Sequence, residues 1–366
     1  MRLDSDKVYV YCAAIAEAQA PSEIYRELAY RALSAVELEL PSAGTCVLKP
    51  NATVLFPPEK RVVTHPGFLA GMLDALLEKG IGPERLVVGD GQSGEDPEKG
   101  FTWENVGYAS MAAERQVRLV EFNEAPSKKI AVPGGVVYEE YPIYTEVADC
   151  SFFFNVPLSK CHNLGCTTLS IKNLMGILDR PERHLCAMQE VDKPLEEGIW
   201  RLTENGISLF EERFYHKLCD IVAALRGLQI PRLCMVDGLI GRDGTAFNEG
   251  QNYPLGWTLI GENEVHVDAV GTYLMGLDPE VTPYLKFAAE RGLGTNRVED
   301  IEVVNLADGT ELEIQGLRSR RVLMPVASYG EGYYPRFRVD GSVVPWRLDD
   351  VNKQRQEDSQ ALIPAT

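Results

Sequence analysis

The chain has 366 residues, enough for one large α/β domain or two modest ones, and its 45% hydrophobic content is ordinary for a globular protein. Acidic residues outnumber basic ones, 54 against 36, so the formal net charge is −18. Such a surface repels phosphates and anionic lipid, so we expect neither a nucleic acid nor a membrane as partner. The first residues hold no apolar stretch long enough for a signal peptide or membrane span, which predicts a cytoplasmic protein.

The first third of the chain alternates strand-like and helical segments. The patterns predict strands at 8–12, 46–48, 85–88 and 117–122, and helices at 21–36, 65–77 and 103–115. This alternation favours an α/β fold with a doubly wound, mostly parallel sheet. In such sheets ligands bind beyond the carboxyl ends of the strands, where loops converge.

The rest of the chain is more varied. A β-rich insertion is expected at 129–156, followed by a helix at 211–225, a strand at 233–236, and helices at 266–275 and 283–292. Alternating β runs at 301–305 and 311–315 then precede an aromatic stretch and a polar tail. We therefore expect an α/β core at 1–300 and a C-terminal β extension with a polar tail at 301–366.

The eight cysteines are scattered and include no CxxC motif. In a chain this long, that pattern predicts reduced, mostly buried thiols, and it lacks the clustering of a ferredoxin-type iron–sulfur site. Cys161 and Cys166 form one close pair, which either ligates a metal with His162 or consists of two small buried thiols.

Two motifs follow strands in the first third. The sequence GDGQSG at 89–94 matches GxGxxG, but acidic residues and a proline follow it. A glycine-rich turn that presents Asp90 therefore fits better than a dinucleotide site. Lys49 and Asn51 follow another strand, where the lysine is either an anion ligand or a surface residue at a turn.

The segment SKCHNLGCTTLSIKNLMG, at 159–176, is the densest polar pattern in the chain. It places Lys160, His162, Lys172 and Asn173 around a predicted strand-to-helix turn. Lysines in a dry pocket stabilise a carboxylate or a developing enolate and lower each other's pKa, and a histidine transfers protons. The segment therefore indicates anion binding with proton transfer.

Three acidic residues downstream are candidate partners. Asp237 ends a predicted strand, and Glu249 lies in a glycine-containing loop. Asp268 interrupts an apolar run, where a carboxylate must be paired, functional or the cap of a helix.

Taken together, these motifs resemble the domain-of-unknown-function family 362. The resemblance covers residues 45–295 and rests on VLKPNAT (47–53), NVPLSKCHNLGCTTLSIKNLMG (155–176), MVDGLIG (235–241) and GENEVHVDAVGTYLMGLDP (261–279). The family is distantly similar to the N-terminal domain of nickel-dependent lactate racemase, whose metal-pincer pattern this chain does not show. Many relatives carry a ferredoxin-like cysteine module, which this chain lacks. The resemblance implies one cleft lined by Lys49, Asn51, Lys160, His162, Lys172, Asn173, Asp237, Glu249 and Asp268.

The leading hypothesis is an enzyme of isomerase or lyase type that acts on a small anionic metabolite by acid/base chemistry. His162, Lys160, Asp237 and Asp268 would be catalytic, and the substrate would be bound by Lys49, Asn51, Lys172, Asn173 and Glu249. One alternative is a divalent metal held by His162, Asp237, Glu249 and Asp268. Others are a non-catalytic ligand-binding protein and a redox accessory protein. The sequence leaves open whether the chain forms a homo-oligomer.

Overall fold

The computed structural model describes residues 1–54, 56–91, 102–162, 164–179, 203–205, 207, 209–244 and 250–324, and the backbones of two short strands near the C-terminus. Among these residues, no helix is both long enough and apolar enough to span a bilayer.

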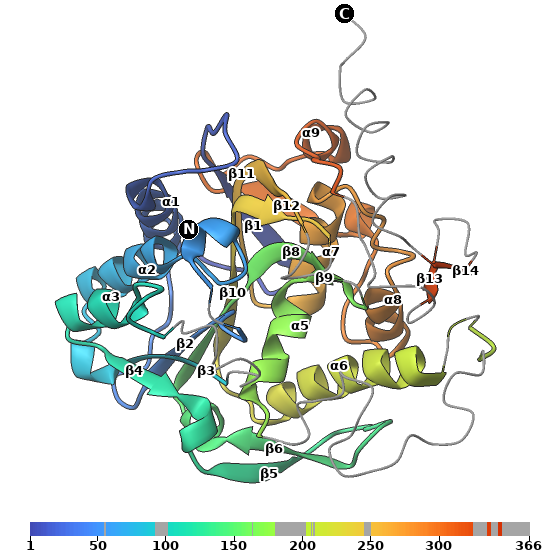
Figure 1. The fold of residues 1–366 in the computed structure, drawn as a ribbon, viewed down its shortest axis with the longest axis horizontal. Helices are drawn as coiled ribbons and strands as arrows, with labels where there is room; N and C mark the ends of the chain where they lie inside the picture. The colour runs from blue at the N-terminus through green and yellow to red at the C-terminus, as the bar shows by residue number, and fades with distance from the viewer. Residues whose placement is uncertain are drawn as a thin grey trace, which may run out of the picture.

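One large sheet organises the described part of the chain (Figure 1). Its main path runs in the order β12-β1-β11-β10-β7-β2-β3-β4, and β8 and β9 branch from β10. The bounds are β1 (Lys7–Cys12), β2 (Cys46–Pro50), β3 (Leu86–Asp90), β4 (Arg118–Glu121), β7 (Phe152–Val156), β8 (Leu158–His162), β9 (Cys166–Thr168), β10 (Arg232–Arg242), β11 (Asn252–Gly261) and β12 (Glu302–Asn305).

The predicted α/β class and mostly parallel sheet are confirmed. Strands β10, β7, β2, β3 and β4 run parallel to one another, whereas β11 runs antiparallel to both β10 and β1. Strands β2, β3 and β7 are buried along their whole length, as parallel strands covered on both faces must be. Their carboxyl ends therefore meet at one edge of the sheet.

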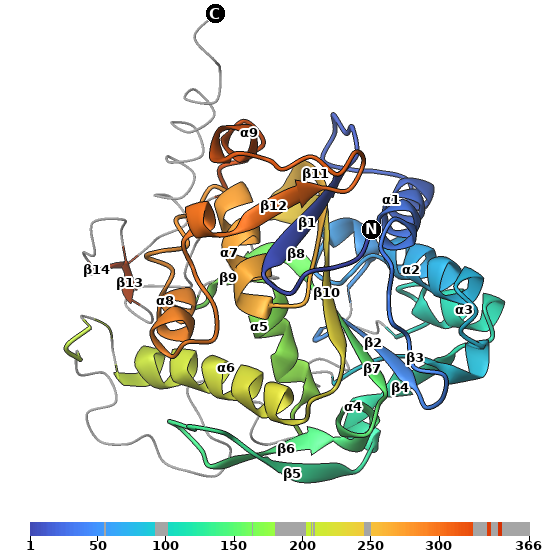
Figure 2. The same cartoon turned by 180° about the vertical axis from the view of Figure 1, so that it is seen from behind.

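Helices cover both faces of the sheet, as Figure 2 shows from behind. One face packs against α1 (Ser22–Ser34), α2 (Pro66–Glu78) and α3 (Tyr108–Glu114). The other packs against α4 (Thr145–Ala148), α5 (Ser170–Asn173), α6 (Leu209–Gly227), α7 (Glu264–Leu274) and α8 (Pro283–Glu290). Alternate strand residues feed the two cores, Leu48 on one side and Val47 on the other, because side chains alternate along a strand.

The β-rich insertion is a separate hairpin of β5 (Ser127–Ala131) and β6 (Glu140–Tyr144). In the region predicted as a C-terminal extension, β12 pairs with β1 and so forms an edge strand of the main sheet. A small hairpin of β13 (Pro335–Phe337) and β14 (Val343–Pro345) follows. The aromatic stretch that contains Tyr329 and Tyr333 lies outside the described residues.

Two predicted elements are corrected. The β run expected at 311–315 makes only a bridge between Val304 and Glu311, after which the chain turns into α9 (Ile314–Arg318). The helix expected at 103–115 begins only at Tyr108, because Gly107 has a φ of 82° and interrupts the helical backbone. The seven described cysteines are free thiols, as predicted, and Cys186 lies outside the described residues.

Candidate functional site

Five buried side chains join into one hydrogen-bonded group at the carboxyl edge of the parallel strands. We call Asp90, Lys49, Asn173, Asn51 and Lys160 the polar cluster. Lys49 and Asp90 lie at the ends of β2 and β3, Asn51 directly follows β2, and Asn173 ends α5. Lys160 comes from β8, so the fold brings together segments that lie more than 100 residues apart in sequence.

An ion pair forms one end of the polar cluster. Lys49 Nζ lies 2.7 Å from Asp90 Oδ1, and both side chains are completely buried. Asp90 also accepts hydrogen bonds from the backbone N–H groups of Ala52 (2.7 Å) and Gly91 (2.9 Å). These bonds fix the carboxylate beside Lys49, and residues 92–94 of the predicted glycine-rich turn lie outside the described residues.

Two amides link the buried lysines. Asn173 Oδ1 accepts from Lys49 Nζ (3.1 Å) and from Asn51 Nδ2 (3.2 Å). Asn51 Oδ1 accepts in turn from Lys160 Nζ, at 3.1 Å. Asn173 Nδ2 donates to Asn155 Oδ1 at 2.8 Å, which fixes the orientation of the amide. A side chain that moves in this group therefore disturbs the next one.

Lys160 forms the other end. Its Nζ also donates to the carbonyl of Val62, at 2.9 Å, so both of its hydrogen-bond acceptors among the described residues are neutral. Burial, helped by the positive charges of Lys172 and Arg242, lowers the pKa of Lys160 to about 7, and the charge of Asp90 opposes this shift. Arg242 pairs in register with Lys160 across β8 and β10. This end of the cluster is rich in positive charge.

His162 lies two residues after Lys160 on β8, so both side chains project to the same face of the strand. Its Nδ1 accepts hydrogen bonds from the backbone N–H groups of Leu164 (2.9 Å) and Gly165 (3.0 Å). Because Nδ1 is an acceptor, the proton of the neutral ring is on Nε2. His162 therefore presents an Nε2–H donor.

Lys172 lies beside an aromatic ring, since its Nζ is 5.7 Å from the centre of the Phe214 ring.

Asp237 belongs to a neighbouring ion pair. Its Oδ2 accepts from Arg61 Nη2 at 2.7 Å and from the backbone N–H of His65 at 2.9 Å. The ring of His65 stacks on Tyr25, with centroids 3.8 Å apart, and burial lowers its pKa to about 3, so it is neutral. The pair attaches the segment that carries Val62 to the centre of the sheet.

Asp268 caps the short helix α5. Its two oxygens accept from the backbone N–H groups of Ser170 (2.6 Å) and Ile171 (2.9 Å). Tyr284 adds a third hydrogen bond, at 3.3 Å. Burial raises the pKa of Asp268 to about 7, although the N–H donors oppose this shift. This is the capping alternative considered for Asp268, and it positions the helix that carries Asn173.

The structure thus brings Lys49, Asn51, Lys160 and Asn173 together and places Asp237 and Asp268 in supporting contacts. Glu249 lies outside the described residues. Within the part of the chain that the structure describes, no three His, Cys, Asp or Glu side chains are grouped as metal ligands, and this includes the Cys161, Cys166 and His162 set.

Three residues that the sequence did not single out as site residues belong to this region. Asp90 ends an apolar strand, and Asn155 interrupts the run of phenylalanines in β7, so a polar residue in a buried strand was the available signal. Arg61 lies in a connecting segment with a φ of 55°, which is rare for a non-glycine residue. No sequence pattern marks it.

Comparisons with known proteins agree with the motifs. The chain is 24% identical over 280 residues to the thylakoid-associated protein sll1697 of Synechocystis sp.. The aligned region covers 76% of this chain and 77% of the relative. A solved structure from Thermotoga maritima is 16% identical, with a TM-score of 0.37, and the match covers 66% of this chain and 55% of that one. A likeness of that size supports no inference. Residues 46–273, more than half of the chain, match the domain of unknown function DUF362, and the chain therefore belongs to this family.

Proposed function

We propose that the protein is an enzyme that binds a small organic anion beside Lys160 and moves a proton on it, giving an isomerisation, an elimination or a rearrangement. The observation that carries this proposal is the setting of Lys160. The residue is 5% exposed, and its amine donates only to neutral acceptors among the described residues and lies in the field of the positive charges of Lys172 and Arg242.

A buried ammonium in this setting is costly, because burial removes its hydration and no carboxylate among the described residues accepts a hydrogen bond from it. The cost falls when the amine loses its proton or when an anion binds next to it. The first makes Lys160 a base near neutral pH, and the second makes the site selective for an acid. Proton abstraction next to a carboxylate needs both properties.

The roles follow from the contacts. Lys160 takes or returns the proton, and the cations of Lys172 and Arg242 attract the carboxylate of the substrate. The Nε2–H of His162 donates to the oxyanion that develops as the proton leaves. Asn51 and Val62 orient the Lys160 amine. Bound negative charge raises the pKa of Lys160, so the amine holds the abstracted proton better once substrate is present.

Solvent exchange tests the proposal without knowledge of the full reaction. The protein is incubated in D₂O with individual 2-hydroxy, 2-oxo and 3-oxo carboxylates. The loss of the carbon-bound protons next to the carboxylate or the ketone is followed by ¹H NMR. We expect one class of acid to exchange with the wild type and with the surface control Lys128→Met, and to exchange at least 100-fold more slowly with Lys160→Met. If an acid binds but its carbon-bound proton never exchanges, the protein is a non-catalytic ligand-binding protein, and the proposal that it is an enzyme is refuted.

The metal-dependent alternative gains no support from the described residues, because His162, Asp237 and Asp268 each have separate partners. The cytoplasmic location stays a prediction, which cell fractionation with an antibody against the protein tests.

A further inference from the structure

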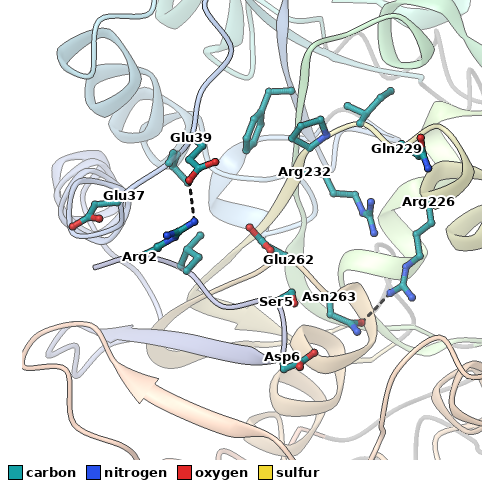
Figure 3. A pocket seen from close by; sticks show the side chains of 15 residues that line it. Arg2, Ser5, Asp6, Glu37, Glu39, Arg226, Gln229, Arg232, Glu262 and Asn263 are labelled. Carbon is teal, nitrogen blue, oxygen red and sulfur yellow. Dashed lines mark hydrogen bonds and ion pairs between the residues drawn. The ribbon is translucent and has the colours of Figure 1, made fainter.

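A polar hollow lies at the edge of the sheet opposite the polar cluster, where β7 and β10 begin (Figure 3). Its volume is about 720 Å³, within the range of small-molecule sites. The walls come from the N-terminal segment, the segment after α1, the end of α6 and the loop between β11 and α7. It shares no residue with the polar cluster.

The cationic side of the hollow is fixed from behind. Glu264, 1% exposed, binds the Nε of Arg232 with one carboxylate oxygen and the Nη2 of Arg226 (2.9 Å) with the other. The side chain of Arg232 is 19% exposed, and its two terminal nitrogens have no hydrogen-bond partner among the described residues. They form a donor fork of the kind that binds a carboxylate through two parallel bonds.

The anionic side is Glu262. It lies near enough to Arg232 for each charge to shift the pKa of the other group, yet no ion pair joins them within the described part of the chain. Burial raises the pKa of Glu262, and the charge of Arg232 opposes this. Figure 3 shows Arg2 paired with Glu39 nearby, at 3.1 Å, and both of these side chains are exposed.

An apolar wall completes the hollow, made of Leu3, Leu38, Phe152, Ile230 and Pro231. The lining therefore offers a carboxylate-binding fork, a partly buried carboxylate and an apolar surface. A simple anion would leave the carboxylate of Glu262 facing it without compensation, and a simple cation would leave the terminal nitrogens of Arg232 without an acceptor. A molecule with both charges and an apolar part satisfies all three surfaces.

We propose that this hollow binds a small zwitterion of the α-amino-acid class. The carboxylate of the ligand lies on the terminal nitrogens of Arg232, its ammonium faces Glu262, and its side chain contacts the apolar wall. This site does not depend on the proposed enzyme function.

Thermal shift and isothermal titration calorimetry test the proposal on the full chain, with each of the twenty protein amino acids as probe. We expect at least one to bind, and its deaminated acid and decarboxylated amine to bind at least 10-fold more weakly. Glu262→Gln removes a charge that makes no hydrogen bond in the described structure, so the fold should persist while the affinity falls at least 10-fold. The exposed Glu280→Gln and the distant Lys160→Met should bind as the wild type does.

Three results would overturn the proposal. They are the absence of binding by every amino acid, equal binding of the deaminated acid, and unchanged affinity in Glu262→Gln. The Lys160→Met variant also shows that the two sites are separate. If it binds the amino acid normally but no longer catalyses solvent exchange, the hollow binds its ligand independently of the polar cluster.

Discussion

Gly176 lies against the ion pair of the polar cluster, and its replacement by alanine should break that pair. A Cβ at this position would clash with Asp90 Oδ1 and lie 2.8 Å from Lys49 Cε and 2.9 Å from Lys49 Nζ. Real Cβ atoms essentially never approach neighbours within 3.0 Å, so Asp90 or Lys49 must move. Both are fully buried, and neither has solvent to move into.

The size of the effect follows from the pair that is lost. Disrupting a buried ion pair costs about 3–5 kcal/mol, and the lower entropy of the unfolded alanine chain returns about 0.4–1 kcal/mol. We therefore expect Gly176→Ala to lower the free energy of unfolding by roughly 3 kcal/mol. The matched control is Gly316→Ala in α9, where a Cβ meets nothing within 4 Å and alanine favours the helix.

Urea unfolding followed by circular dichroism measures both variants. The Asp90→Ala background removes the carboxylate that the new methyl group would hit, so Gly176→Ala should cost at least about 2 kcal/mol less there than in the wild type. Equal stability of Gly176→Ala and Gly316→Ala, or an unchanged cost in the Asp90→Ala background, would refute the argument.

Three further predictions concern the charged residues around the polar cluster. The pKa of Lys160 is about 7 in the folded protein and 10.5 ordinarily, so the wild type should lose roughly 4–5 kcal/mol of stability as pH falls from above 10.5 to 7. Urea unfolding of Lys160→Met should lack this slope, and parallel pH profiles would contradict the shift. Asp237→Leu should lower the free energy of unfolding by about 3–5 kcal/mol, because it leaves Arg61 without its carboxylate. Asp237→Asn should lower it clearly less, because one amide oxygen replaces Oδ2, and equal losses in the two variants would argue against the ion pair. Asp268→Ala should lower the free energy of unfolding by about 1–3 kcal/mol, because it leaves two buried N–H groups of α5 without an acceptor. An unchanged urea midpoint would argue against the cap.

The grouping of Lys49, Asn51, Lys160 and Asn173 was expected from the family resemblance, and part of it has a physical reason. The strand-and-helix alternation implies a parallel sheet, and polar residues after such strands meet at one edge. The contact between Lys49 and Asn173, 124 residues apart, was expected only from the family resemblance, because Asn173 ends a short helix and does not follow a strand. The partner of each polar atom depends on side-chain geometry, which periodicity does not contain.

Buried carboxylates were harder to interpret. Asp237 and Asp268 both lie in apolar runs, and burial requires a partner whether the role is catalytic or structural. Their partners, Arg61 and the N–H groups of α5, come from distant segments. The run at 311–315 was misread because Glu-Leu-Glu-Ile-Gln alternates as a strand does, although after the turn at Gly309, with a φ of 74°, the segment makes one bridge and then enters α9.

We propose that Lys160 is a buried amine with a pKa near neutrality that binds an organic anion. Lysine Cε signals in ¹³C-labelled protein, followed from pH 5 to 11 by NMR, measure this pKa. We expect one lysine signal that titrates near pH 7, is missing from Lys160→Met, and titrates at higher pH when the exchanging acid is added. A Lys160 signal that titrates above about pH 9.5, or one that the acid leaves unchanged, would contradict it.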